Sequence, residues 1–288
     1  MRGGLLVIDP KDDVDNSNAL QLLANLNNET DMTVDSRYLD VLIKLRESNL
    51  LRKEDIRQYD LLCESCVPSM LARFEYLLDW DPHALKGDED HLSLIRYVIG
   101  LRFGWLKIEG IARFAVALKA GMKHFPDDLG FLFEKADDGK TTCHLAFEKL
   151  GKEEALRAIR ECIPVSTKYP ILHHVIKNAP EYMNDFARRY PSAIFLRDEK
   201  QRLFHHVALR SGRTLQNDPM IILQMTDDKL EEKDPVTDLY PFMNAASAEV
   251  PDVETIYYLL RRNLSVVDRS RRIVKCKSSK KASPKRNR

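Results

Sequence analysis

Adjacent histidines occur at two places in the chain, and imidazole is both a common metal ligand and a common acid–base catalyst. The stretch PILHHVIKNAP contains His173 and His174, and the stretch RLFHHVALRSG contains His205 and His206. Both pairs lie among apolar residues. Neighbouring side chains on a helix diverge by about 100°, so one pair rarely chelates a metal ion. The pairs are therefore interpreted as structural, and no metal site is predicted.

A C-x-x-C sequence, Cys63 to Cys66, is the second candidate for chemistry, because such pairs occur in zinc sites and redox enzymes. A zinc site needs a second pair of ligands, and the other cysteines are single and distant. The pattern favours two helical neighbours on a buried face. The chain has five cysteines, an odd number, which favours a reducing compartment over a disulfide framework.

Acidic pairs at 137–138 and 227–228 could supply paired carboxylates for acid–base catalysis. Each pair lies at a predicted turn or helix start, where the backbone and the helix dipole favour acids. The chain contains no glycine-rich phosphate loop and no G-x-S-x-G or H-E-x-x-H sequence. The chain is therefore predicted not to be an enzyme, and no catalytic residue or cofactor is assigned.

The elements that position these residues are predicted to be helices. Hydrophobic residues make up 44 % of the chain and charged residues 31 %, and the apolar positions follow helical spacing from Tyr38 to about Val267. The run Ile194–Leu196 has strand character and is interpreted as a link. No apolar run approaches the ~20 residues of a membrane span. Three regions follow: a disordered segment at 1–36 with a short helix at 19–26, a helical domain at 37–268, and a disordered basic tail at 269–288.

A histidine-centred pattern recurs along the helical domain. The stretches ADDGKTTCHLAF, KYPILHHVI, DEKQRLFHHVALRSG and DPVTDLYPFMNAA align so that His144, His173, His206 and Met243 share one position, at spacings of 29, 33 and 37 residues. Amphipathic segments recur between these copies, and each is followed by a proline or a leucine. A period of about 33 residues with two helices predicts stacked repeats.

These copies resemble the ankyrin repeat, whose head sequence is D-x-x-G-x-T-P-L-H-x-A. The phrases WDPHALK, RYPSA and YYLLRRN are similar to divergent ankyrin-like proteins of the kind abundant in diatoms. No copy is complete. Leu203 and Tyr240 occupy the capping threonine position, and Gln201 and Asp238 replace the turn glycine. The resemblance implies an all-α fold, a solenoid of stacked helix-turn-helix ankyrin-like repeats.

The resemblance also implies a function. Stacked repeats present an extended concave surface that binds proteins, so the chain is predicted to be a monomeric, non-catalytic protein-interaction scaffold with an unidentified protein partner. The contacts are expected at turn and first-helix positions. The candidate residues are Lys140, Lys200, Arg202, Leu239 and Tyr240.

The basic tail suggests a second function. Residues 269–288 contain ten Lys or Arg and no acid, whereas the other 268 residues hold 35 basic and 44 acidic residues. Two basic clusters about ten residues apart have the form of a bipartite nuclear-import signal. Nucleic-acid association through this tail is the alternative function, and a plain solvated tail is a third interpretation. The expected location is intracellular, cytoplasmic or nuclear. The import candidates are Arg271, Arg272, Lys280, Lys281, Lys285 and Arg286.

Overall fold

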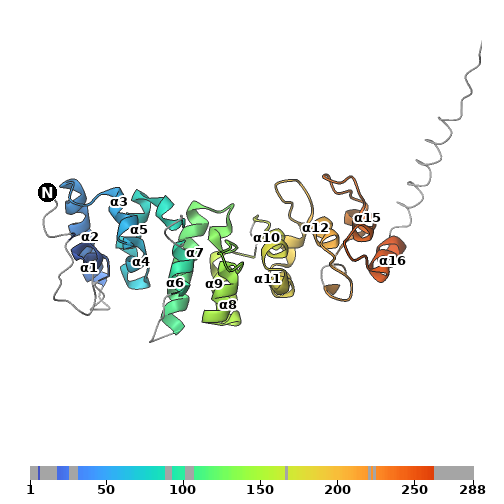
Figure 1. Cartoon of the computed structure of the whole chain (residues 1–288), viewed down its shortest axis with the longest axis horizontal. Helices are drawn as coiled ribbons and strands as arrows, with labels where there is room; N and C mark the ends of the chain where they lie inside the picture. The colour runs from blue at the N-terminus through green and yellow to red at the C-terminus, as the bar shows by residue number, and fades with distance from the viewer. Residues whose placement is uncertain are drawn as a thin grey trace, which may run out of the picture. The chain divides into compact units, whose positions relative to one another are not determined.

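The computed structural model describes residues 6, 18–25, 32–87, 93–100, 107–165, 168–219, 222 and 225–262 (Figure 1). In these residues the fold is all-α, as predicted, and β pairing is limited to isolated bridges between Lys135 and Thr141 and between Arg197 and Leu203. The basic tail and its import candidates lie outside the described residues. The chain divides into two compact units, residues 1–164 and 165–288.

The first unit is built of packed pairs of helices (Figure 1). Helix α1 packs against α4, α2 against α5, α6 against α7 and α8, and α9 against α7 and α8. The α-helices are α1 (Ala19–Asn25), α2 (Met32–Glu47), α3 (Lys53–Gln58), α4 (Leu61–Ser65), α5 (Leu71–Trp80), α6 (Leu94–Gly100), α7 (Lys107–His124), α8 (Thr142–Leu150) and α9 (Lys152–Cys162). The 3-10 helices are η2 (Pro68–Met70), η3 (Pro82–Leu85) and η4 (Leu129–Phe131).

A buried ion pair joins the first helices of this unit. Arg73 on α5 donates from Nε to Asp35 Oδ1 on α2 at 2.6 Å, and from Nη1 to the Leu23 carbonyl of α1 at 2.7 Å. Helix α1 therefore packs onto the unit, with Leu20 fully buried. The short helix expected at 19–26 is present as α1. Helix α2 also covers the end of the segment at 1–36, where the sequence predicts disorder. Asp35 on this helix neutralises the buried Arg73, which holds the helix in place.

Two glycines set the distance between the end of α7 and η4. A Cβ atom on Gly121 would lie 2.7 Å from the Gly130 Cα, and one on Gly130 would lie 2.9 Å from the Met122 nitrogen. Gly130 also has a φ of 60°. The two backbones thus touch directly, and any side chain at either position would separate them.

The second unit continues the pairing of short helices (Figure 1). Helix α10 packs against α11 and α12, α12 against α15, and α16 against α14 and α15. Phe186, Tyr190 and Phe204 are fully buried between them. The α-helices are α10 (Ile171–Asn178), α11 (Met183–Arg189), α12 (Phe204–Arg210), α14 (Asp227–Leu230), α15 (Pro241–Ala246) and α16 (Val253–Arg262). The 3-10 helices are η5 (Pro180–Tyr182) and η6 (Pro191–Phe195).

Proline ends five of these helices at the same distance. Helices α5, α7, α9, α10 and α11 each stop two residues before Pro82, Pro126, Pro164, Pro180 and Pro191, respectively. The residue before a proline is disfavoured in the helical conformation, which explains the common end point. Pro191 also explains why the strand-like run Ile194–Leu196 is not a strand. It starts η6, which includes Ile194 and buries it.

None of the helices in the described part of the chain combines the length and apolar character that a membrane span requires.

Candidate functional site

Three tight turns precede the helices that carry the recurring pattern. The Ala136 amide donates to the Lys140 carbonyl at 3.1 Å before α8, and the Asp198 amide donates to the Arg202 carbonyl at 3.0 Å before α12. A similar turn precedes α15, where the Asp234 amide donates to the Leu239 carbonyl at 2.9 Å. The three positions with positive φ in these turns are Gly139 at 76°, Gln201 at 61° and Asp238 at 57°.

The lysines predicted to contact a partner lie on these turns. Lys140, in the first unit, is exposed and pairs with Glu148 through Nζ and Oε2 at 2.9 Å. Lys200, in the second unit, is also exposed, and its amide donates to Asp198 Oδ1 at 3.0 Å. Both side chains therefore extend from a backbone that the turn holds in place.

Arg202 has a structural role in its turn. Its Nε donates to Asp198 Oδ2 at 2.8 Å, and its amide donates to Asp198 Oδ1 at 2.8 Å. Burial opposes ionisation of Asp198, but these hydrogen bonds from Arg202 prevail and lower the pKa of that carboxyl group. Asp198 thus stays ionised at neutral pH and holds both ends of the turn.

Leu239 and Tyr240, the remaining predicted contacts, are half-buried at the third turn. The Tyr240 ring stacks on Phe242 with centroids 6.2 Å apart, and Lys233 Nζ lies 5.2 Å from the Tyr240 centroid. Lys233 also pairs with Asp238 at 2.9 Å. The result is an aromatic and basic cluster at the start of α15.

The third residues of α10 and α12 donate hydrogen bonds to the backbone at or just before the next of these turns. His173, third in α10, donates from Nε2 to the Arg202 carbonyl at 3.1 Å, and His206, third in α12, donates to the Glu232 carbonyl at 3.0 Å. Carbonyl oxygens only accept, so Nε2 carries the proton in both rings. The histidines thus link consecutive turns of the second unit.

The sequence pattern missed a third donor of this kind. Arg96 is the third residue of α6, and its Nη1 donates to the Lys140 carbonyl at 3.1 Å. Its side chain is largely buried at 10 % exposure. The signal was the alignment of SLIR, from Ser93 to Arg96, with TTCH, from Thr141 to His144. A search for histidine alone could not find it, although arginine supplies the same donor.

The Nδ1 nitrogens of His144, His173 and His206 face the start of the helix that carries each histidine. His206 Nδ1 accepts from the Leu203 amide at 3.3 Å, and His144 Nδ1 accepts from the Thr141 amide at 3.2 Å. His173 Nδ1 is buried without a hydrogen-bond partner, because the equivalent residue is Pro170, which has no amide hydrogen. This position therefore carries an uncompensated buried acceptor.

Burial keeps His173, His205 and His206 neutral. Loss of solvation lowers the pKa of His173 to about 4 and is also the largest cause of the lowered pKa of His206. Burial, with a smaller effect from the adjacent His206, places the pKa of His205 well below its usual value. The His205 and His206 centroids are 4.2 Å apart. In the described part of the chain, no three His, Cys, Asp or Glu residues are grouped to hold a metal ion.

Cys63 and Cys66 are both buried, as the sequence pattern indicates. Burial raises the pKa of the Cys66 thiol to about 12, and it raises the pKa of Cys63 well above its usual value, with added repulsion from Asp60. Thiols with raised pKa values are poor nucleophiles at neutral pH. The pair therefore fills the core rather than forming a reactive site.

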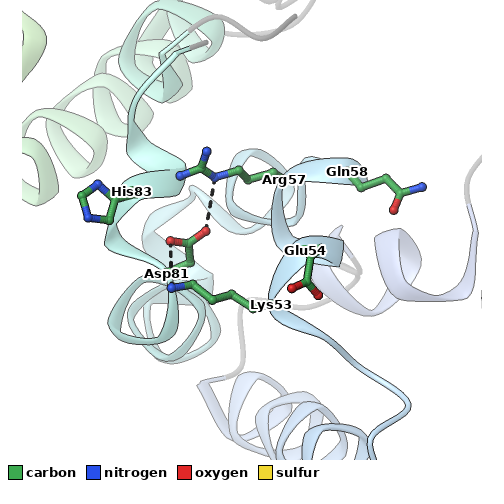
Figure 2. A pocket seen from close by; sticks show the side chains of 6 residues that line it. All are labelled: Lys53, Glu54, Arg57, Gln58, Asp81 and His83. Carbon is green, nitrogen blue, oxygen red and sulfur yellow. Dashed lines mark hydrogen bonds and ion pairs between the residues drawn. The ribbon is translucent and has the colours of Figure 1, made fainter.

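A depression of about 620 Å³ lies between α3 and η3 in the first unit (Figure 2). Figure 2 shows Arg57 and Lys53 pointing toward Asp81, while Gln58 points away. Arg57 Nε lies 3.2 Å and Lys53 Nζ 3.5 Å from the Asp81 carboxylate, which is largely buried. The only indication of this cluster in the sequence is an aspartate between a helix and a proline. Two cations thus neutralise one buried carboxylate at this depression, which offsets the cost of burying it.

Comparison with known protein families, curated proteins and solved structures found no match to this chain.

Proposed function

We propose that the chain is a non-catalytic protein-interaction scaffold built from ankyrin-like repeats. The observation that supports it is the repeated link between a first helix and the next turn, made by Arg96, His173 and His206. The two histidine links hold successive turns of the second unit side by side, and in the first unit Arg96 ties the start of α6 to the turn before α8. Turns fixed in this way can present side chains to a protein partner without a large ordering cost.

The proposed contact surface in the second unit comprises the turns before α12 and α15. An ion pair between Arg197 and Glu232 joins these turns, in addition to the histidine links. Lys200 and Tyr240 present a cation and an aromatic ring from them, and Leu239 adds an apolar contact. Aromatic residues with neighbouring cations are common anchors of protein interfaces. In the first unit, Lys140 is the proposed contact.

Arg202 is a poor probe of this surface because Asp198 engages its guanidinium. Its substitution would change the stability of the turn together with any contact. Lys200 is the better probe, since only its amide contributes to the turn. Tyr240 is the second probe.

The tail supports a second proposed function, association with nucleic acid or nuclear import. Its ten basic residues and absence of acids in 269–288 favour this function, whereas the acidic remainder of the chain restricts it to the tail. Binding to nucleic acid would weaken steeply with salt, because each phosphate contact releases a counterion.

The test is affinity capture from nuclease-treated cell extract with three full-length baits: the natural chain, a Lys200→Glu/Tyr240→Ala variant, and a tail variant with Lys280, Lys281, Lys285 and Arg286 changed to Ala. Quantitative mass spectrometry should find a protein whose capture falls at least about tenfold with the turn variant and is unchanged with the tail variant. Equal thermal unfolding of the three baits serves as the control. Partners that require only the tail would reject the scaffold proposal and support the alternative.

A further inference from the structure

Among the five helices that end before a proline, one carries a charge where the others carry an apolar side chain. The residue directly before the proline is Phe125, Ile163, Ala179 or Tyr190 after α7, α9, α10 and α11, but Asp81 after α5. Ile163, Ala179 and Tyr190 are fully buried, and Asp81 is only 4 % exposed. Asp81 therefore places a carboxylate at a position where this scaffold otherwise packs an apolar group.

Packing alone does not favour a buried aspartate at this position. Charges lose water on burial, so a buried ion pair is often no more stabilising than apolar side chains of similar size. The ion pairs of Asp81 have a different consequence, because they hold the side chains of Lys53 and Arg57 at one place. These two side chains are 48 % and 38 % exposed. Asp81 thus positions two solvent-accessible cations at the depression between α3 and η3.

The depression presents more hydrogen-bond donors than acceptors to solvent (Figure 2). The Asp81 side chain is largely covered, whereas Lys53, Arg57 and the exposed His83 line the depression with an ammonium, a guanidinium and an imidazole group. Glu54 is the exposed acid among the six lining side chains. Guanidinium and ammonium groups form their strongest hydrogen bonds with anionic oxygens. The lining is therefore suited to a carboxylate ligand.

An aromatic ring and a further cation lie beside His83. The Phe125 and His83 ring centroids are 5.8 Å apart, and Lys86 Nζ lies 5.1 Å from the Phe125 centroid. Phe125 is half-buried and Lys86 is exposed. A half-buried ring among cations can contact an apolar side chain next to a carboxylate. This combination fits a protein segment better than a small free anion.

We propose that the depression binds an acidic segment of a protein partner, whose carboxylates contact Lys53, Arg57 and His83. This inference rests on the proposed scaffold function and adds a contact site of defined partner chemistry in the first unit. Outside 269–288 the chain has 35 basic and 44 acidic residues, which would repel the continuous phosphates of a nucleic acid. A short acidic segment, by contrast, meets only the local excess of cations.

The test is the binding of a fluorescein-labelled octaglutamate peptide to the full-length chain, followed by fluorescence anisotropy at low salt. The ten basic residues of 269–288 are changed to Gln in every sample, so that the tail does not bind the peptide. Lys53→Glu is the test variant, and Lys149→Glu, at an exposed lysine of α8, is the matched control. Glu54→Gln and Glu161→Gln form a second pair, in which an exposed acid is neutralised at the depression or on α9.

Lys53→Glu should weaken peptide binding at least about fivefold, and Lys149→Glu should have a smaller effect. Glu54→Gln should strengthen binding about twofold, because it removes a carboxylate that repels the peptide, and a loss of folding cannot produce this gain. The proposal is overturned by absence of peptide binding, by equal effects of the two lysine substitutions, or by equal effects of the two glutamate substitutions. An eight-nucleotide single-stranded DNA that competes more strongly than the peptide for this site would also overturn it.

Failure of this inference and failure of the scaffold proposal give different results. If the peptide does not bind but capture from extract depends on Lys200 and Tyr240, only the assignment of the depression is wrong. If the peptide binds through Lys53 but no protein is captured through the turns, the turn surface is rejected and the site for an acidic segment remains.

Discussion

The turns at residues 136–140 and 198–202 have the same backbone conformation but are held in different ways. Gly139 supplies the positive φ in the first turn, and Gln201 supplies it in the second. Arg96 donates to the first turn, and His173 donates to the second. The second turn thus uses a residue that disfavours the conformation and a donor that can titrate.

The second turn compensates with additional hydrogen bonds. Arg197 Nη1 donates to the Gln201 carbonyl at 2.9 Å, and Asp198 receives three bonds from the turn. A non-glycine residue in the left-handed region costs about 1 kcal/mol, which a few such bonds can offset. The turn conformation therefore follows from its surroundings as much as from the residue at the left-handed position.

A second left-handed glycine, Gly130, tests the limit of that compensation. Gly130→Ala places a Cβ within 2.9 Å of the Met122 nitrogen and keeps a positive φ, so the first unit should lose about 3 kcal/mol or more. Gly139→Ala, where nothing lies within 4 Å, should cost only about 1 kcal/mol. Urea unfolding followed by tryptophan fluorescence measures both, because both tryptophans of the chain fall within residues 1–164. Equal losses of stability in the two variants would show that the close backbone contact at Gly130 does not add to the cost of the substitution.

Acid should affect the histidine-linked turns of the second unit. The folded state holds the pKa of His173 at about 4, whereas the unfolded value is 6.5, so the unfolded chain binds protons first as the pH falls below 6.5. The contribution of His173 is complete above pH 6.5 and is lost through the interval down to about 4. At pH 4.5 the free energy of unfolding should be lower by about 2.5 kcal/mol from this residue.

The control for acid sensitivity is His173→Gln, which keeps a donor for the Arg202 carbonyl but does not titrate. Urea unfolding by far-ultraviolet circular dichroism at about pH 7 and about pH 4.5 should show a smaller difference in this variant. An unchanged difference would assign the acid sensitivity to other groups, such as Asp198 or His205.

The link itself can be removed at His206, which bonds to both the Leu203 amide and the Glu232 carbonyl. His206→Ala leaves both backbone groups without this partner and should lower the free energy of unfolding by about 2 kcal/mol. His206→Asn preserves part of the hydrogen bonding and should cost less. Circular dichroism in urea measures the series, and a larger loss in the Asn variant would contradict this role.

Sequence patterns predicted the periodic features of this fold well. Helical spacing, helix ends before prolines and the shared position of His173 and His206 all follow from local chemistry. The ion pair of Arg73 with Asp35 and the contact of Gly121 with Gly130 could not be predicted, because they depend on which helices meet. Arg96 was missed because a guanidinium and an imidazole make the same bond from different residues.

Replacing Gln201 with glycine makes the second turn like the first at its left-handed position. Glycine removes a strain of about 1 kcal/mol but increases the freedom of the unfolded chain, so a net gain of about 0.5 kcal/mol is expected. The Gln201 carbonyl keeps its bond to Arg197, since that bond uses the backbone. Lys200→Gly, one residue earlier, is the matched control and should destabilise, because Lys200 does not have a positive φ. Urea unfolding measures both variants, and a loss on Gln201→Gly would mean that the glutamine side chain contributes more than its strained backbone costs.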